Sequence, residues 1–295
     1  MENMTEEEIA EFISTCYRLK PEKLIMNELK WKYLVRSGIR GKNILLIGPT
    51  GSGKTLAAQS LVKALKREDK FFYINMGATQ DPRTALIGNT HFSKNEGTFF
   101  DESAFIRAIR TPNMVILLDE ISRGHPDSWN LLITPLDYLQ RYLRLDEAKG
   151  SETVRVAPGV TFIATANIGN EYTATRVMDR ALLDRFSVKI EVDVLSIEQE
   201  RDLIKMLVPT ADAKVIKAVT EIAKFSREMN EESKVNKAIS TRAVVEMAEL
   251  SADGFDLKEI AEMVIYPDYP ADGGIDSERT LMKQVVQKHI PSGVR

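Results

Sequence analysis

The chain has 295 residues, of which 43% are hydrophobic and 28% are charged, as is usual for a globular protein with a sizeable core. A formal net charge of −3 excludes a global field that would draw the protein to nucleic acid or to an anionic membrane. The single cysteine, Cys16, excludes an intramolecular disulfide and a cysteine-based metal site, and the 3 histidines form no metal-ligand spacing.

The N-terminal sequence MENMTEEEIAEF is acidic, whereas a secretory signal is basic and then apolar. No apolar run in the sequence approaches the length that spans a membrane. We therefore expect a protein that does not insert into membranes and that resides in the cytoplasm, where a lone thiol stays reduced.

Two helices are predicted before the first strand. Residues 5–19 begin with Thr5, a favourable N-cap residue, and carry apolar side chains at helical spacing. A second helix is predicted over residues 21–35, after which two glycines interrupt the chain. We expect residues 1–40 to form a helical segment that packs on the domain that follows.

The rest of the chain is organised around residues 43–55, NILLIGPTGSGKT. An apolar strand leads into a glycine-rich loop, and the loop ends in Lys54 and Thr55 at the start of a predicted helix. The pattern G-x-x-x-x-G-K-[ST] between a strand and a helix is typical of a phosphate-binding loop. Glycines suit this loop because side chains would keep main-chain N–H groups away from a polyphosphate.

The loop predicts which residues bind the nucleotide. Lys54 is expected to reach the β and γ phosphates, and the Thr55 hydroxyl is expected to lie on Mg²⁺. The start of the helix adds unpaired N–H groups and a positive dipole end. The predicted nucleotide-binding residues are Gly48, Pro49, Thr50, Gly51, Ser52, Gly53, Lys54, Thr55 and Leu56.

An α/β pattern continues after the loop. A second strand is predicted over residues 71–75, followed by a long polar and glycine-containing stretch, 77–101. A helix over residues 103–110 ends before a threonine-proline pair.

The next strand, residues 114–118, is continuously apolar and is followed by Asp119 and Glu120. Continuous apolarity favours a strand buried on both faces of a parallel sheet, and acids at its carboxyl end lie where such sheets bind ligands. Asp119 is expected to hold magnesium, directly or through water, and Glu120 to polarise the attacking water. Two acids after a core strand also fit a solvated turn, and the upstream phosphate loop favours the functional interpretation.

A helix is predicted over residues 128–139, kinked or divided by Pro135, and a hairpin over residues 141–156. Another strand of the buried type, 160–166, ends at Asn167. Asn167 at this place is suited to bonding the γ-phosphate or orienting the water, although a strand-ending asparagine is also an ordinary turn residue.

The alternation of strands and helices stops near residue 195, where we place a domain boundary. The preceding segment carries a predicted strand over 188–194. The helices predicted after the boundary are 196–208, 214–229, 241–250 with Ser240 as its cap, 257–265 and 277–289.

Taken in this order, the pieces resemble the AAA+ ATPases, and within them the branch of MoxR-type, dynein-related and magnesium-chelatase-type proteins. The resemblance covers about residues 40–250. GPTGSGKT looks like the Walker A motif and VILLDE like Walker B, and Asn167 falls where the family has sensor 1. An insertion before the Walker B strand, 85–100, and a hairpin before sensor 1 favour this branch.

The resemblance also points to three arginines. The segment DRALLDRF is similar to the arginine-finger segment of the family, which assigns that role to Arg185 and makes Arg180 the second candidate. The sequence Ser-Thr-Arg-Ala at 240–243 looks like the lid segment that bears sensor 2, which points to Arg242. Whether Arg242 would act on the nucleotide of its own subunit or of the next one stays open.

The fold implied by the resemblance is an α/β P-loop NTPase: a parallel sheet flanked by helices, followed by a small all-α lid domain. The implied domains are residues 1–40, 41–195 and 196–295. The implied activity is hydrolysis of ATP with Mg²⁺, and the choice of ATP over GTP rests on the resemblance alone. The implied assembly is a ring of identical subunits, most often a hexamer, in which a neighbour supplies the arginine.

Two kinds of motor fit these expectations. One is a remodelling ATPase or chaperone that acts on protein partners, which in this branch are often proteins with a von Willebrand A-type domain. The other is a nucleic-acid motor or loader used in restriction, replication or packaging, because cations and aromatic rings in a pore can follow a strand. The residues that motivate the second alternative are Lys94, Phe99, Phe100, Arg141, Arg144, Lys149 and Arg155.

A third alternative is a scaffold that binds nucleotide and hydrolyses it slowly or not at all. The presence of Glu120, Asn167 and Arg185 argues against it.

Overall fold

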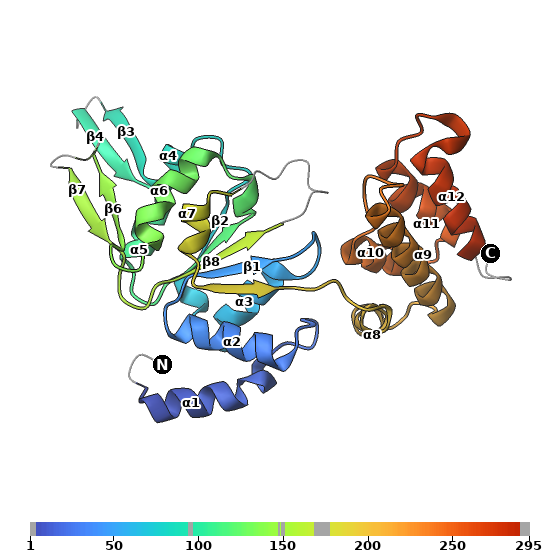
Figure 1. Cartoon of the computed structure of the whole chain (residues 1–295), viewed down its shortest axis with the longest axis horizontal. Helices are drawn as coiled ribbons and strands as arrows, with labels where there is room; N and C mark the ends of the chain where they lie inside the picture. The colour runs from blue at the N-terminus through green and yellow to red at the C-terminus, as the bar shows by residue number, and fades with distance from the viewer. Residues whose placement is uncertain (1–3, 94–96, 147, 149–150, 168–177, 290–295) are drawn as a thin grey trace. The chain divides into compact units, whose positions relative to one another are not determined.

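The computed structural model describes residues 4–93, 97–146, 148, 151–167 and 178–289 (Figure 1). The chain divides into two compact units, one formed by residues 1–49 and 53–192 and the other by residues 50–52 and 193–295. The first unit is a parallel sheet flanked by helices, and the described part of the second contains helices and turns. The predicted fold class is confirmed.

The sheet of the first unit has 5 parallel strands in the order β2-β5-β8-β1-β9. The strands are β1 (Ile44–Ile47), β2 (Phe71–Asn75), β5 (Val115–Asp119), β8 (Thr161–Ala166) and β9 (Val188–Glu191). Strand β8 lies between the strand that leads into the glycine-rich loop and the strand that ends in the acids. Since all strands are parallel, their carboxyl ends meet at one edge of the sheet.

The central strands are buried on both faces, as their continuous apolarity predicts. Ile116 and Leu118 of β5 belong to one hydrophobic cluster, with α5 (Ala104–Arg110) and α6 (Pro126–Leu136). Val115 and Leu117 belong to another, with α2 (Glu28–Ile39) and α3 (Lys54–Ala64). Successive side chains of a strand point to opposite faces, so each face needs its own layer of helices. The helices of the first unit are α1 (Glu6–Thr15), α2 (Glu28–Ile39), α3 (Lys54–Ala64), α4 (Pro82–Leu86), α5 (Ala104–Arg110), α6 (Pro126–Leu136) and α7 (Arg180–Asp184).

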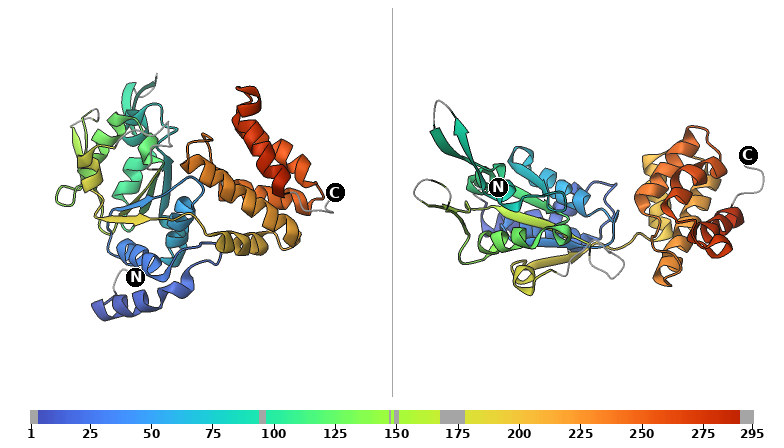
Figure 2. Two further views of the ribbon diagram at one scale, coloured as in Figure 1. Left: turned by 45° about the vertical axis from the view of Figure 1, so that its right-hand side comes forward. Right: turned by 90° about the horizontal axis from the view of Figure 1, so that it is seen from above.

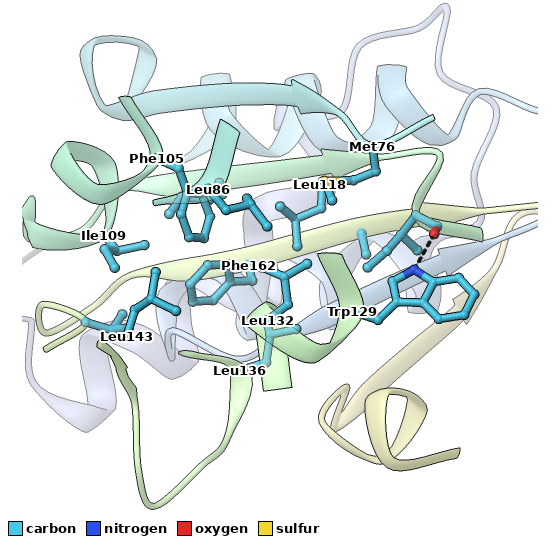
Figure 3. Packing of buried hydrophobic residues seen from close by; sticks show 14 of the residues in the cluster. Met76, Leu86, Phe105, Ile109, Leu118, Trp129, Leu132, Leu136, Leu143 and Phe162 are labelled. Carbon is cyan, nitrogen blue, oxygen red and sulfur yellow. Dashed lines mark hydrogen bonds between the residues drawn. The ribbon is translucent and has the colours of Figure 1, made fainter. Parts of the chain in front are cut away.

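Figure 3 shows the cluster on the α5 and α6 face. Phe105 of α5 and Leu132 of α6 flank Phe162 of β8. The indole of Trp129 is buried in the same cluster, and its Nε1 donates a hydrogen bond of 2.9 Å to the carbonyl of Ile121. This bond ties α6 to the turn that follows the acids, because a buried indole N–H needs an acceptor.

The N-terminal segment differs in part from its prediction. Thr5 caps α1 as expected, but the α-helix ends at Thr15 and continues to Leu19 as a 3-10 turn. Helix α2 begins at Glu28 rather than at residue 21. The Asn27 side chain accepts a 2.8 Å hydrogen bond from the N–H of Lys30 and so provides a cap that the apolar pattern does not reveal. Trp31 of α2 is fully buried in the cluster that contains β1, so the segment packs on the sheet.

Two β-hairpins project from the same side of the first unit (Figures 1 and 2). They are formed by β3 (Gly88–Ser93) with β4 (Gly97–Glu102) and by β6 (Tyr142–Leu145) with β7 (Glu152–Arg155). The first hairpin lies largely in the polar, glycine-containing stretch 77–101, for which no strand was predicted. The Arg110 guanidinium forms ion pairs of 2.8 Å with Glu102 and 2.7 Å with Glu152, which connect the two hairpins.

The second unit has its own hydrophobic core. Its helices are α8 (Ile197–Leu207), α9 (Ala213–Glu231), α10 (Thr241–Ala252), α11 (Leu257–Ile260), which continues as a π-helical turn (Ala261–Ile265), and α12 (Glu278–His289). The Ser196 capping box and the Ser240 cap form as predicted. Among the helices that the structure describes, none has the length and apolar character that a membrane span requires.

Candidate functional site

The glycine-rich loop joins the end of β1 to the start of α3. Gly51 has a φ of +80° and Gly53, which is the N-cap of α3, a φ of +93°. Residues with a Cβ rarely adopt these angles, so the path of the loop requires glycine at both positions. The loop thereby leads directly into a helix N-terminus, whose unpaired N–H groups suit an anion.

Lys54 is the first residue of α3, and only 8% of it is exposed. Its Nζ donates hydrogen bonds of 2.8 Å to the carbonyl of Gly48 and 2.6 Å to that of Pro49. Burial lowers the pKa of Lys54 to about 8, although the charges of Asp119 and Glu120 oppose this shift. A polyphosphate in the loop would stabilise the ammonium form that burial disfavours.

Three hydroxyl groups converge on the carboxylate of Asp119, which is 8% exposed. The Thr55 Oγ1 lies 3.2 and 3.3 Å from its two oxygens, and the Tyr73 hydroxyl lies 3.2 Å from Oδ2. Thr165 donates a short hydrogen bond to Oδ1. The pKa of the Tyr73 phenol is raised, mainly by burial and next by the negative charge of Asp119.

The pairing of Thr55 with Asp119 fits a magnesium site. Mg²⁺ prefers hard oxygen ligands, usually one or two from the protein with water and phosphate supplying the rest. A hydroxyl oxygen within 3.3 Å of a buried carboxylate provides such ligands at the mouth of the loop. In addition, no described residue hydrogen-bonds the buried hydroxyl oxygen of Ser52 in the loop.

Glu120 follows the end of β5 in a left-handed backbone conformation, with φ 54° and ψ 42°. Its N–H donates a 2.9 Å hydrogen bond to the Oγ1 of Thr165. Its carboxylate is 34% exposed, and the Arg123 Nη1 lies 3.5 Å from both oxygens, the outer limit of a hydrogen bond. The side chain is therefore placed beside Asp119 and is only weakly restrained.

Asn167 directly follows β8 and is 8% exposed. Ala166 pairs with Ile47 at the end of β1, and its carbonyl accepts a 3.2 Å hydrogen bond from the N–H of Gly48. The register thus brings Asn167 to the sheet edge where the loop begins. The structure gathers Lys54, Thr55, Asp119, Glu120 and Asn167 at this one edge.

The three predicted arginines lie elsewhere in the chain. Arg185 follows α7, is 30% exposed, and its Nε lies 3.1 Å from the Oδ2 of Asp137. Arg180 is exposed at the start of α7, and Arg242 is exposed in the first turn of α10 in the second unit. Within the part of the chain that the structure describes, no hydrogen bond or ion pair joins Arg185 to the acids of the site.

One basic residue of the nucleic-acid alternative, Arg141, is half-buried and bonded within the first unit, so it is not a free cation of the hairpin. Arg141 donates hydrogen bonds of 2.8 Å to the Val160 carbonyl and 3.1 Å to the Asn43 Oδ1, and its guanidinium lies over the Phe162 ring. Burial lowers the pKa of Arg141. The hairpin pattern did not reveal this because an arginine before a strand is more often a surface residue.

The remaining residues of that alternative are divided. Phe100 packs against the core, Phe99 and Arg155 are exposed, and Arg144 is exposed but paired with Asp146 at 2.6 Å. Lys94 and Lys149 lie outside the described residues.

Sequence reasoning missed Tyr73 and Thr165. Each lies two residues before a polar residue that ends its strand, Asn75 in β2 and Asn167 after β8. Residues two apart in a strand share a face, so a search for hydroxyl groups at these positions would have found both.

The fold and this edge of polar residues define a P-loop nucleotide-binding protein of the AAA+ class. Residues 43–186 match the family model described as AAA domain (dynein-related subfamily), and residues 200–287 match that described as CbbQ/NirQ/NorQ C-terminal. The chain belongs to the MoxR-like, dynein-related branch of the AAA+ ATPases, as the resemblance implied.

Two curated proteins are similar to this chain over more than two thirds of its length. A Thauera aromatica protein named "Putative chaperone BssE" is 34% identical over 74% of this chain and 72% of its own length. An uncharacterized protein of Staphylococcus saprophyticus is 31% identical over 71% and 78%.

Solved structures show the same fold at low identity. A closed-state reconstruction of Hsp104 with ATPγS and casein is 16% identical, with a TM-score of 0.53 over 78% of this chain and 48% of that one. NtrX from Brucella abortus is 14% identical, with a TM-score of 0.51 over 96% and 73%.

Proposed function

We propose that the protein hydrolyses ATP with Mg²⁺ in a ring of identical subunits, a hexamer as is common in its family, and uses the energy to remodel a protein partner. The observation that carries the proposal is the contact of the Thr55 hydroxyl with the Asp119 carboxylate beside the buried ammonium of Lys54. Phosphoryl transfer needs positioning and charge neutralisation more than covalent chemistry, and this edge of the sheet offers both.

Each residue has a role that follows from its place. The loop amides and the Lys54 ammonium bind phosphate oxygens, and Thr55 with Asp119 holds Mg²⁺, which supplies further neutralisation of phosphate charge when it is bound. Glu120 accepts a proton from the attacking water, because its carboxylate is partly exposed, only weakly paired with Arg123, and next to Asp119 in the chain. Asn167 hydrogen-bonds the γ-phosphate or the water.

Turnover would be completed by a second subunit. Arg185 is the proposed arginine finger, because it is partly exposed and its Nε lies 3.1 Å from Asp137; Arg180 is the second candidate. Arg242 is proposed as sensor 2, acting on the nucleotide of its own or the next subunit. An arginine that reaches the phosphates of a neighbour contributes on the order of 10³–10⁵ in rate.

The relatives and the state of the basic residues favour a protein partner. The relative named as a chaperone supports a protein client, and a von Willebrand A-type partner fits the branch. Arg141, one of the cations that favoured a nucleic-acid track, is half-buried and hydrogen-bonded to the Val160 carbonyl, so it is less available to a nucleic acid. The cytoplasmic location stays a prediction from the sequence.

The deciding experiment measures the ATPase rate as a function of protein concentration, with and without single- and double-stranded DNA. The proposal predicts a rate per subunit that rises with concentration as subunits assemble and that DNA does not change. Stimulation by DNA that weakens with salt would instead favour the nucleic-acid motor. No ATP hydrolysis at any concentration contradicts the proposed activity.

A further inference from the structure

The hydroxyl of Thr165 is shared by the two acids of the site. Thr165 is 1% exposed on β8, where its Oγ1 donates to the Asp119 Oδ1 and accepts from the N–H of Glu120 at 2.9 Å. A hydroxyl has a single proton, and a carboxylate accepts but does not donate at neutral pH. The Thr165 oxygen therefore accepts a hydrogen bond from the Glu120 N–H, and the Thr165 hydroxyl proton is donated to Asp119.

The other donors to Asp119 cannot replace this contact. Thr55 is a proposed magnesium ligand, so its hydroxyl oxygen is needed for the metal, and Tyr73 reaches only the opposite carboxylate oxygen. Tyr73 is also half-exposed, whereas Thr165 is interior. Of these three hydroxyl groups, Thr165 is the one that is both buried and bonded to Glu120.

The hydrogen bond from the Glu120 N–H to Thr165 holds a residue whose backbone conformation is unfavourable. A φ of 54° is uncommon for a residue with a side chain as long as glutamate, and such a conformation persists where the surroundings hold it. Thr165 bonds the N–H of this residue and so favours that conformation. It follows that the direction in which the Glu120 carboxylate leaves the sheet depends on a side chain of the neighbouring strand.

We infer that Thr165 is a positioning residue that orients the metal-binding carboxylate and the catalytic base together. The inference rests on the proposed ATP hydrolysis. Asn167 follows β8 two residues after Thr165, so the strand that carries this hydroxyl also leads into Asn167. Asp119 and Glu120 are thus joined by one threonine hydroxyl.

The test uses Thr165→Val, which keeps the shape and removes both hydrogen bonds. The matched control is Thr161→Val, because Thr161 lies on the same strand, is fully buried and donates a 3.0 Å hydrogen bond to the Gly38 carbonyl. Thr165→Ser should keep the wild-type activity, because serine retains the hydroxyl that valine lacks.

Four quantities are measured for each variant: kcat, KM for ATP, the Mg²⁺ concentration for half-maximal rate, and hydrogen–deuterium exchange of the Glu120 amide without nucleotide. Loss of a group that orients metal ligands typically costs ~10–100-fold in metal affinity or activity. We expect Thr165→Val to lower kcat by that factor, to raise the Mg²⁺ requirement and to speed exchange at Glu120. Thr161→Val should leave all four near the wild-type values.

Two results overturn the inference. One is a Thr165→Val protein with the wild-type kcat, Mg²⁺ requirement and Glu120 exchange. The other is an equal loss in Thr161→Val, which would show that destabilisation of the strand is the cause. If the wild type itself does not hydrolyse ATP, the proposed function fails, and faster exchange at Glu120 in Thr165→Val alone still decides whether Thr165 holds that amide.

Discussion

The Oδ2 of Asp137 lies 3.1 Å from the Nε of Arg185. The same carboxylate accepts hydrogen bonds of 2.8 Å from the N–H of Leu139 and 3.0 Å from that of Gln140. These two amides, more than the charge of Arg185, hold the pKa of Asp137 below its usual value. Arg185 is therefore paired with a carboxylate that is ionised at neutral pH, and the loop after α6 is shaped by the same group.

Substitution of Arg185 by Ala should abolish turnover while leaving nucleotide binding intact. If Arg185 reaches a neighbour's phosphates, the rate should fall on the order of 10³-fold or more. The affinity for a fluorescent ATP analogue and the ATPase rate are measured on the same preparation. Arg180→Ala is the matched control, and a loss confined to Arg180→Ala would reassign the role to that residue.

Action across subunits is tested by mixing two inactive proteins. Lys54→Ala removes the nucleotide site and Arg185→Ala removes the proposed finger, so a mixed ring contains some interfaces in which both groups are intact. We expect ATPase activity to recover in the mixture and not in either protein alone. An inactive mixture whose subunits are shown to co-assemble contradicts hydrolysis between subunits.

Glu120→Gln should bind ATP and accumulate an assembled form without turnover, because the amide keeps the shape of the side chain and cannot take up a proton. Mass measurement in solution with ATP should show the oligomer, and the ATPase rate should fall by ~10²–10⁴-fold. Lys54→Ala, by contrast, should lose binding. Wild-type turnover in Glu120→Gln would mean that another group is the base.

The affinity for nucleotide should decrease as the pH rises above about 8. The pKa of Lys54 in the free protein is about 8 because the side chain is buried, and phosphate binds the protonated form. Binding above pH 8 must therefore be accompanied by uptake of a proton, which lowers the apparent affinity. Calorimetry at pH 7 and pH 9 in two buffers measures both effects. Their absence at pH 9 contradicts contact between Lys54 and phosphate.

A stability prediction concerns the second unit. Glu200 is fully buried, and its two oxygens accept 2.6 and 3.1 Å hydrogen bonds from Arg227 and a 2.7 Å hydrogen bond from Thr241 at the start of α10. Glu200→Ala leaves the guanidinium unpaired and should destabilise this unit by about 3–5 kcal/mol. Asp202→Ala, on the exposed side of α8, should cost well under 1 kcal/mol. The free energies of unfolding of the two variants are compared by denaturant titration, with circular dichroism as the measure of helix content.

Much of the fold was predictable because it depends on local pattern. Strand β2 occupies residues 71–75 as predicted, and the caps at Ser196 and Ser240 form where a hydroxyl precedes an apolar helix face. Continuous apolarity identified the strands that are buried on both faces. The start of α2 was not predicted, since the cap of Asn27 competes with an apolar pattern that begins earlier.

The sequence by itself determined the phosphate loop, the two acids and the strand that ends at Asn167, because motif spacing and hydrophobic period are local properties of the chain. Only the tertiary structure decided that Tyr73 and Thr165, each 46 residues from Asp119, bond its carboxylate, and that Arg141 is hydrogen-bonded to the Val160 carbonyl. These contacts depend on the order β2-β5-β8-β1-β9 and on strand register. Neither is encoded in any single segment, because pairing between strands is a property of the assembled sheet.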